Sequence, residues 1–290
     1  MPTSIADSIL KGANLLRGAG VPYPRREAGS LMAYTLGRDR TYILCHADDF
    51  ITGDDESRFG DFLEARMTGR PLQYITGHQE FFGLDFEVTP DVLIPRPETE
   101  LLVETALKLM VGLKTAPFVC DVGTGSGCIP VALLHELRTF PATRAVAIDV
   151  SEAALSVAKR NATRHSVVDR IEFIVSDCFA KLDPARFQFD LIVSNPPYVA
   201  ARAIAGLQRE VRDFEPRLAL EAGIDGLDIV RRLLAEAGSF LKPQRHLLIE
   251  IGFDQREAVE KLVDRDTWEL IDIHKDLQGI PRTVALEKRG

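Results

Sequence analysis

Residues 121–127, with the sequence DVGTGSG, are the part of the chain from which its fold can be inferred. They follow a short apolar run at residues 118–122 and precede an apolar segment with helical spacing at residues 129–134. Glycines between a strand and a helix allow a tight turn and let a ligand approach the backbone amides at the helix start. The spacing is GxGxG and not the GxGxxG of dinucleotide-binding proteins, so by itself it is modest evidence for a nucleotide site.

Strands and helices alternate along the chain after this turn. Apolar runs of strand length occur at residues 145–149, 171–175, 189–193 and 246–251, and helical patterns occur at residues 152–161 and 228–240. Strands that are apolar along their whole length and are separated by helices are typical of a parallel sheet covered on both faces. The sequence therefore predicts an α/β fold, in which ligands bind at the carboxyl ends of the strands.

The residues before this alternation have a different character. Up to residue 76 the apolar side chains recur at helical spacing, which predicts a small helical domain. Residues 77–97 contain an alternating apolar stretch interrupted by Gly83, and Pro95 and Pro97 favour extended backbone before them. We therefore expect a helical domain at residues 1–76, a β-hairpin linker at residues 77–97 and the α/β domain at residues 98–290.

Composition narrows the class of protein. The chain has 290 residues, of which 46% are hydrophobic and 27% charged, as in ordinary globular proteins. Its formal net charge of −8 argues against a protein that holds nucleic acid mainly through phosphates. The four cysteines and six histidines lack ligand spacing, so we expect no metal site. The sequence has no signal-peptide pattern and no apolar run of membrane-spanning length, which predicts a cytoplasmic location.

Acidic residues follow the next two predicted strands. Asp149 ends the second strand, where a carboxylate can accept hydrogen bonds from both ribose hydroxyls or can cap the following helix. Asp177 and Cys178 follow the third strand, where they can meet an adenine ring or form an ordinary turn. Together with the glycine-rich turn, Asp149 favours an adenosine-containing ligand. The choice between a nicotinamide cofactor and S-adenosylmethionine stays open at this point.

The tetrapeptide Asn195-Pro196-Pro197-Tyr198 follows the fourth strand and points to a reaction. Neither proline has an N–H, and Pro197 favours extended backbone at Pro196, so this corner is rigid. The Asn195 side-chain oxygen and a neighbouring carbonyl can each accept one hydrogen of a planar NH2 group, and Tyr198 can pack on it. Because such a nitrogen is a weak nucleophile, alignment with a sulfonium methyl and stabilisation of positive charge on nitrogen provide much of the catalysis.

In this order, the glycine-rich turn, Asp149 and NPPY resemble methyltransferases that modify amide or exocyclic nitrogens. The wider sequence resembles the bacterial peptide chain release factor N5-glutamine methyltransferases, from about residue 70 to the end. The motifs that carry this resemblance are residues 70–77 (RPLQYITG), 81–84 (FFGL), 92–100 (VLIPRPETE), 215–216 (EP) with 219–220 (AL), 225–228 (DGLD), 250–252 (EIG) with Gln255, and 276–279 (DLQG) with Arg282. The helical N-terminal part fits the substrate-binding domain of that family.

The resemblance implies a Rossmann-like methyltransferase domain with a mainly parallel, seven-stranded sheet and an antiparallel pair at its edge. It also implies S-adenosylmethionine-dependent methylation of the side-chain nitrogen of the glutamine in the GGQ motif of class 1 peptide chain release factors. The expected cofactor-binding residues are Thr99, Gly123, Thr124, Gly125, Ser126, Gly127, Asp149, Asp177, Cys178 and Asn195. The expected substrate-binding residues are Asn195, Pro196, Pro197 and Tyr198, and the expected catalytic residues are Asn195, Pro196 and Tyr198.

Two positions depart from the family pattern. Cys178 stands where relatives often have a tryptophan, so stacking of an aromatic ring on adenine from this position is lost. Ala222 replaces one of a usual pair of glycines before Asp225, so the resemblance does not imply the conformation of that loop.

Three other functions remain open on the sequence. A ribosomal-protein glutamine methyltransferase would resemble this chain but usually has a different segment in place of PRPETE at residues 95–100. A nucleic-acid amino-methyltransferase would also suit NPPY, although the acidic balance counts against it. A non-enzymatic binding module is disfavoured by the intact NPPY and glycine-rich turn. The expected partner is a release factor, with no direct binding to nucleic acid or membrane.

Overall fold

The computed structural model describes residues 3–111, 113 and 115–290, which form two compact units. The smaller unit contains the chain up to His78 together with Gln208–Phe214. The larger unit contains Gln79–Leu207 and Glu215–Gly290. Most of the hairpin expected as a linker therefore belongs to the larger unit. The division into independent domains at residues 76 and 97 stays a prediction.

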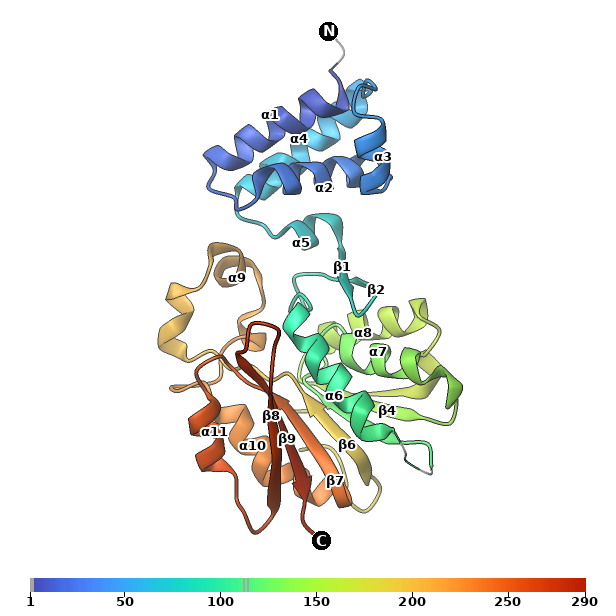
Figure 1. Cartoon of the computed structure of the whole chain (residues 1–290), viewed down its shortest axis with the longest axis vertical. Coiled ribbons are helices and arrows are strands. Elements are labelled where there is room, and N and C mark those ends of the chain that lie inside the picture. Colours follow the sequence, from blue (N-terminus) through green and yellow to red (C-terminus); the bar gives the residue numbers. More distant parts are fainter. Residues whose placement is uncertain (1–2, 112, 114) are drawn as a thin grey trace. The chain divides into compact units, whose positions relative to one another are not determined.

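The smaller unit is built from α-helices (Figure 1). They are α1 (Ile5–Gly18), α2 (Pro24–Leu36), α3 (Arg40–Cys45), α4 (Gly53–Met67), α5 (Leu72–Thr76) and α9 (Arg209–Phe214). Ser4, Asp39 and Thr52 precede three of these helices, and each side chain accepts a hydrogen bond from the backbone N–H three residues later. Leu16 and Leu31 lie in a core shared by these helices. The predicted helical character of this part is confirmed.

Helix α9 belongs to the smaller unit although Glu210 follows Arg66 by 144 residues in the chain. Arg66 of α4 donates hydrogen bonds to Glu27 of α2 and, over 2.7 Å, to Glu210 of α9. The Arg66 side chain is buried, and a buried guanidinium requires acidic partners to offset its lost hydration. This ion-pair cluster therefore holds α9 against α2 and α4.

A seven-stranded sheet forms the centre of the larger unit (Figure 1). Its strands are β3 (Phe118–Val122), β4 (Arg144–Asp149), β5 (Ile171–Val175), β6 (Phe189–Ser194), β7 (Leu241–Glu250), β8 (Trp268–Lys275) and β9 (Pro281–Lys288). The strand order is β5-β4-β3-β6-β7-β9-β8; β9 is antiparallel to both β7 and β8, and all the other neighbouring pairs are parallel. The predicted α/β fold, the mainly parallel sheet and the antiparallel edge are confirmed.

Helices cover both faces of this sheet. On one face lie α6 (Glu100–Met110), α7 (Cys128–Glu136) and α8 (Glu152–Arg164), and on the other lie α10 (Asp228–Glu236) and α11 (Arg256–Leu262). A hairpin of β1 (His78–Phe81) and β2 (Leu84–Glu87) and the 3-10 helices Pro97–Thr99, Leu137–Thr139, Val168–Arg170, Ala201–Gly206, Arg217–Ala219 and Ala237–Phe240 complete the fold. Trp268 is buried in the core and donates its indole N–H to the Leu234 carbonyl.

The direction in which successive strands are added to the sheet reverses between β3 and β6. After β3 it adds β4 and β5 on one side, and then it returns to place β6 on the other side of β3. Asp121 of β3 lies opposite Val193 of β6. The glycine-rich turn after β3 and the NPPY corner after β6 therefore leave the sheet next to each other, at the edge where α/β proteins bind ligands.

Among the described residues, no helix has the length and apolar character needed to cross a bilayer. The same residues contain no group of three or more His, Cys, Asp or Glu side chains arranged to hold a metal ion.

The central strand β3 buries a carboxyl group. Asp121 has no exposed surface, and neither of its carboxyl oxygens has a hydrogen-bond partner within the described ranges. Burial raises the pKa of Asp121 to about 7, against the opposite effect of the nearby Thr124 side chain and with a smaller contribution from the Asp149 carboxyl in the same direction as burial. The folded protein therefore favours the neutral form of this group, because a charge without partners is costly away from water.

We expect Asp121 to make the folded protein less stable as the pH rises. The folded chain keeps this proton up to about pH 7, whereas the unfolded chain loses it at about pH 4. Between these values the folded state binds more protons, so the group lowers the free energy of unfolding by up to about 1.4 kcal/mol per pH unit. Urea unfolding should show Asp121→Asn gaining stability relative to the native sequence as the pH rises from about 4 to about 7.

The exposed Asp266 of the same unit provides the control, because Asp266→Asn should show no such trend. A stability difference between Asp121→Asn and the native sequence that stays constant with pH would contradict this account of the buried carboxyl.

Candidate active site

A cavity of about 360 Å³ lies in the larger unit at the carboxyl ends of β3, β4 and β6. It brings together most of the residues that the sequence singled out. Those in its lining are Thr99, Gly123, Thr124, Gly125, Ser126, Asp149, Asp177, Cys178, Asn195, Pro196 and Pro197. Gly127 and Tyr198 lie outside the lining. The ligand-binding roles of these residues stay predictions, and their geometry is as follows.

The glycine-rich turn has the backbone that only glycine adopts without strain. Gly123, Gly125 and Gly127 have φ values of 77°, 53° and 77°. A Cβ atom at Gly127 would lie 2.9 Å from the Cβ of Ala158 in α8. Gly127 thus allows the turn to pack closely against α8, whereas Gly123 and Gly125 line the cavity.

Asp149 connects β4 to this turn. Its Oδ2 accepts a hydrogen bond from the Gly125 N–H and its Oδ1 accepts one from the Ser151 N–H, both over 2.9 Å. Burial raises the pKa of Asp149, against the opposite effect of these hydrogen bonds. Each carboxylate oxygen can still accept a further hydrogen bond from a ligand hydroxyl. Both roles considered for Asp149, helix capping and ribose binding, fit this geometry. Its Oδ1 accepts a hydrogen bond at the start of α8, and the residue lines the cavity.

The loop after β5 lies beside α10. Asp177 accepts a hydrogen bond from Arg232 of α10 over 2.7 Å, and Cys178 has a φ of 47°, which is unusual for a residue other than glycine. Burial raises the pKa of the Cys178 thiol to about 11, so it is neutral at physiological pH. Val150 and Ile229 add apolar surface to the lining beside this loop.

The NPPY corner presents an oriented amide to the cavity. The Asn195 Nδ2 group donates a hydrogen bond to Thr99 Oγ1 over 2.9 Å, which keeps the carbonyl oxygen Oδ1 available as an acceptor. Pro196 and Pro197 line the cavity next to Asn195. Thr99 was expected to face the cofactor. The structure adds that it holds the Asn195 amide.

Tyr198 is held by its main chain. Its carbonyl accepts a hydrogen bond from Gln255 Nε2 over 3.0 Å, and a Cβ atom at Gly226 would lie 2.4 Å from the same oxygen. Burial raises the pKa of the Tyr198 phenol to about 12, so it stays protonated at neutral pH. Gln255 and Gly226 therefore fix the end of the NPPY corner.

Sequence reasoning did not find the partner of Arg96. The Arg96 side chain donates to Glu215 over 2.6 Å. Glu215 also accepts a hydrogen bond from the Ile94 N–H over 3.3 Å. Glu215 thereby fixes residues 94–96, of which Pro95 and Arg96 line the cavity. The only sequence signal for this pairing was that residues 92–100 and residues 215–216 both belong to the motifs that carry the family resemblance.

Glu250 of β7 was not singled out individually either. Its carboxyl is buried, and Oε2 has no hydrogen-bond partner within the described part of the chain. Burial raises the pKa of Glu250 to about 7, while the Thr99 side chain acts in the opposite direction. A second buried carboxyl therefore lies behind the residue that orients Asn195.

Solved structures share the fold of this chain. The crystal structure of a methyltransferase from Pyrococcus furiosus has a TM-score of 0.52 and 18% identity, and the match covers 78% of this chain and 98% of that one. The hMettl16 catalytic domain in complex with MAT2A 3′UTR hairpin 1 has a TM-score of 0.57 and 18% identity, over 79% of this chain and 80% of that one. At these identities the likeness establishes a methyltransferase fold and nothing more.

Sequence comparisons are more specific. The family model "PrmC N-terminal domain" matches residues 8–77, and the model "Methyltransferase small domain" matches residues 97–211. The release factor glutamine methyltransferase of Koribacter versatilis is 43% identical, over 97% of this chain and 96% of its own. The protein of the same name from Nitratidesulfovibrio vulgaris is 39% identical, over 98% and 96%. Because such relatives match both units over nearly their whole length, the chain belongs to the release factor glutamine methyltransferase family.

Proposed function

We propose that this chain methylates the side-chain amide nitrogen, N5, of the glutamine in the GGQ motif of class 1 peptide chain release factors, with S-adenosylmethionine as the methyl donor. The observation that carries the proposal is the Asn195 amide at the carboxyl end of β6, which Thr99 holds so that its carbonyl oxygen stays available as an acceptor. The relatives named release factor glutamine methyltransferase support the choice of substrate.

The lining of the cavity fits S-adenosylmethionine. The Gly123–Gly127 turn offers a close approach to backbone amides, and the Asp149 carboxylate can accept from ribose hydroxyls. Val150, Ile229 and Cys178 provide apolar surface for an adenine ring in place of the tryptophan that is absent here. When bound, S-adenosylmethionine supplies a methyl group on a positively charged sulfur.

The NPPY corner is suited to a primary amide. Asn195 Oδ1 and a neighbouring main-chain carbonyl can accept one amide hydrogen each, and this holds the nitrogen in a single orientation. The same two acceptors stabilise the positive charge that grows on nitrogen as the new N–C bond forms and the bond between the methyl carbon and sulfur breaks, which would leave S-adenosylhomocysteine. The methylated nitrogen then loses one hydrogen as a proton. No strong base is needed, because an N-protonated amide is a strong acid.

We assign recognition of the release factor to the helical domain at residues 1–76, which the family model for the N-terminal domain supports. The net charge of −8 favours a protein substrate over nucleic acid. We place the activity in the cytoplasm, where release factors act.

Parallel incubations test the substrate. The protein is mixed with S-adenosylmethionine labelled in its methyl group and with unmodified release factor, ribosomal proteins or nucleic acid. We expect label only in the release factor, and we expect its loss when the GGQ glutamine is replaced by glutamate, which has no amide nitrogen. Label in ribosomal proteins or nucleic acid, with none in the release factor, would contradict the proposal that the release factor is the substrate.

Replacing Asn195 should separate catalysis from cofactor binding. Asn195→Ala removes an acceptor of the substrate amide, so turnover should fall by about a hundredfold, the usual effect of losing one such oriented group. The affinity for S-adenosylhomocysteine, measured by calorimetry, should change by less than about threefold, since the glycine-rich turn and Asp149 are unaltered.

The control is Gln188→Ala, which removes another side-chain amide. Gln188 lies just before β6 and donates a hydrogen bond to the Ser239 carbonyl. It should leave turnover close to the native value. Near-normal turnover in Asn195→Ala would exclude the proposed role of Asn195.

A further inference from the structure

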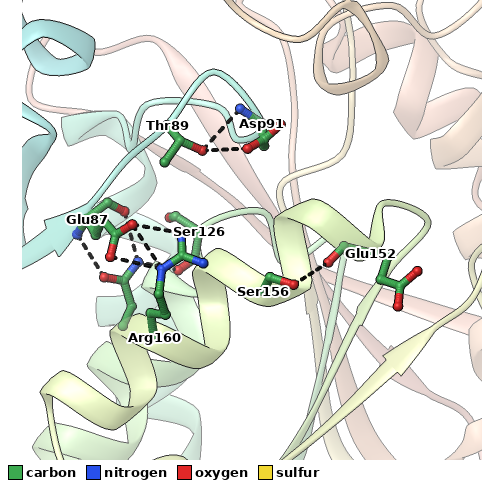
Figure 2. A network of polar contacts seen from close by, with 8 residues as sticks. Glu87, Thr89, Asp91, Ser126, Glu152, Ser156 and Arg160 are labelled. Carbon is green, nitrogen blue, oxygen red and sulfur yellow. Dashed lines mark hydrogen bonds and ion pairs between the residues drawn. The ribbon is translucent and has the colours of Figure 1, made fainter.

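The side chain of Asn161 in α8 is completely buried, and its amide bonds to two separate stretches of main chain. Asn161 Nδ2 donates to the Ser126 carbonyl over 2.9 Å and to the Glu87 carbonyl over 3.0 Å. Asn161 Oδ1 accepts from the Glu87 N–H over 2.7 Å. Figure 2 shows Glu87 of β2 and Ser126 of the glycine-rich turn on the same side of α8.

The Asn161 amide takes the place of a neighbouring strand for β2. It bonds to both the N–H and the C=O of Glu87, as a peptide group of a paired strand would. Its remaining amide hydrogen reaches Ser126, so both hydrogens of the side chain are used in main-chain bonds. A buried amide with all these bonds made is a rigid connection, because breaking it leaves buried polar groups without partners.

Both stretches held by Asn161 lead to walls of the cavity. Ser126 belongs to the glycine-rich turn and lines the cavity itself. Glu87 is followed by a turn in which Thr89 Oγ1 donates to Asp91 (Figure 2), and Asp91 and Val92 also line the cavity. Asn161 therefore links the two stretches that lead to these parts of the wall.

The turn is also seated on the same helix through Gly127. Ala158 lies one helical turn before Asn161 in α8. A Cβ atom added at Gly127 would be 2.9 Å from the Cβ of Ala158. Contact at Ala158 prevents the turn from moving towards α8, and the bond from Asn161 prevents it from moving away. The turn is thus held from both directions by residues three positions apart on one helix face.

We propose that Asn161 is a positioning residue for the cofactor, which sets the place of the glycine-rich turn relative to the stretch that leads from Glu87 to Asp91 in the cavity wall. It acts through main-chain bonds and does not line the cavity. The proposal rests on S-adenosylmethionine being the cofactor, as proposed above. The proposal predicts that ligand binding at the glycine-rich turn is coupled to ordering of the β1–β2 hairpin.

The first test compares variants of the full-length protein. Asn161→Ala removes all three bonds, and Asn161→Asp keeps an acceptor for the Glu87 N–H but cannot donate to Ser126. For both we expect about tenfold weaker binding of S-adenosylhomocysteine in calorimetry, in line with the cost of leaving a buried carbonyl unpaired. The KM for S-adenosylmethionine should rise by a similar factor, while kcat and the KM for the release factor stay within about threefold of the native values.

Two control variants separate positioning from general stability. Arg160→Gln removes the exposed ion pair with the Glu87 carboxylate from the adjacent residue of α8 and should leave binding unchanged. Asp190→Asn disturbs a buried polar network at the amino end of β6, where Asp190 accepts from the Phe118 N–H, and should lower Tm without weakening S-adenosylhomocysteine binding. If the Asn161 variants lower Tm and bind S-adenosylhomocysteine as tightly as the native protein, the proposal is wrong.

The second test uses the native protein and so does not depend on a variant that folds. Hydrogen exchange at the Glu87 amide should slow when S-adenosylhomocysteine is added, because the ligand orders the turn that Asn161 links to β2. Exchange at the Phe118 amide, bonded to Asp190, should not change. An unchanged Glu87 amide would overturn the coupling. Failure of the native protein to bind S-adenosylhomocysteine would instead overturn the proposed function.

Discussion

The parallel pairing of β3 with β6 is the constraint on which the rest of the site depends. Asp121 lies opposite Val193, so the two strands end at the same level of the sheet. A parallel pair cannot be joined by a short turn, and the chain between β3 and β6 therefore builds β4, β5 and their helices before it returns. Because of this return, a turn near residue 125 and a corner near residue 195 open into one cavity.

Much of the fold and part of the candidate site could be predicted from the sequence because they depend on local chemistry. Apolar runs of strand length and helical spacing predict the α/β alternation without any knowledge of tertiary contacts. Gly123 and Gly125 have positive φ values, and the two prolines after Asn195 exclude regular structure, so each motif carries its own geometry. The edge on which these motifs meet follows from the parallel sheet.

The parts that could not be predicted are pairs of side chains from distant segments. Arg96 pairs with Glu215 instead of the nearby Glu98, and Asp177 pairs with Arg232 of α10. Each pairing depends on where the helices lie once they have packed, and no periodicity in the sequence reports this. The same holds for Glu210, whose bond to Arg66 brings α9 into the smaller unit.

Two asparagines of the larger unit differ in how many hydrogen bonds their side-chain amides have left to make. Asn161 is completely buried, and its oxygen and both of its hydrogens bond to main chain, so nothing remains for a ligand. Asn195 lines the cavity and donates to Thr99, which leaves its oxygen available as an acceptor. Before folding, the two side chains are chemically identical. The difference between them therefore lies in the bonds that each amide has left to make: Asn161 is used up in holding main chain, whereas Asn195, held by Thr99, keeps its oxygen as an acceptor.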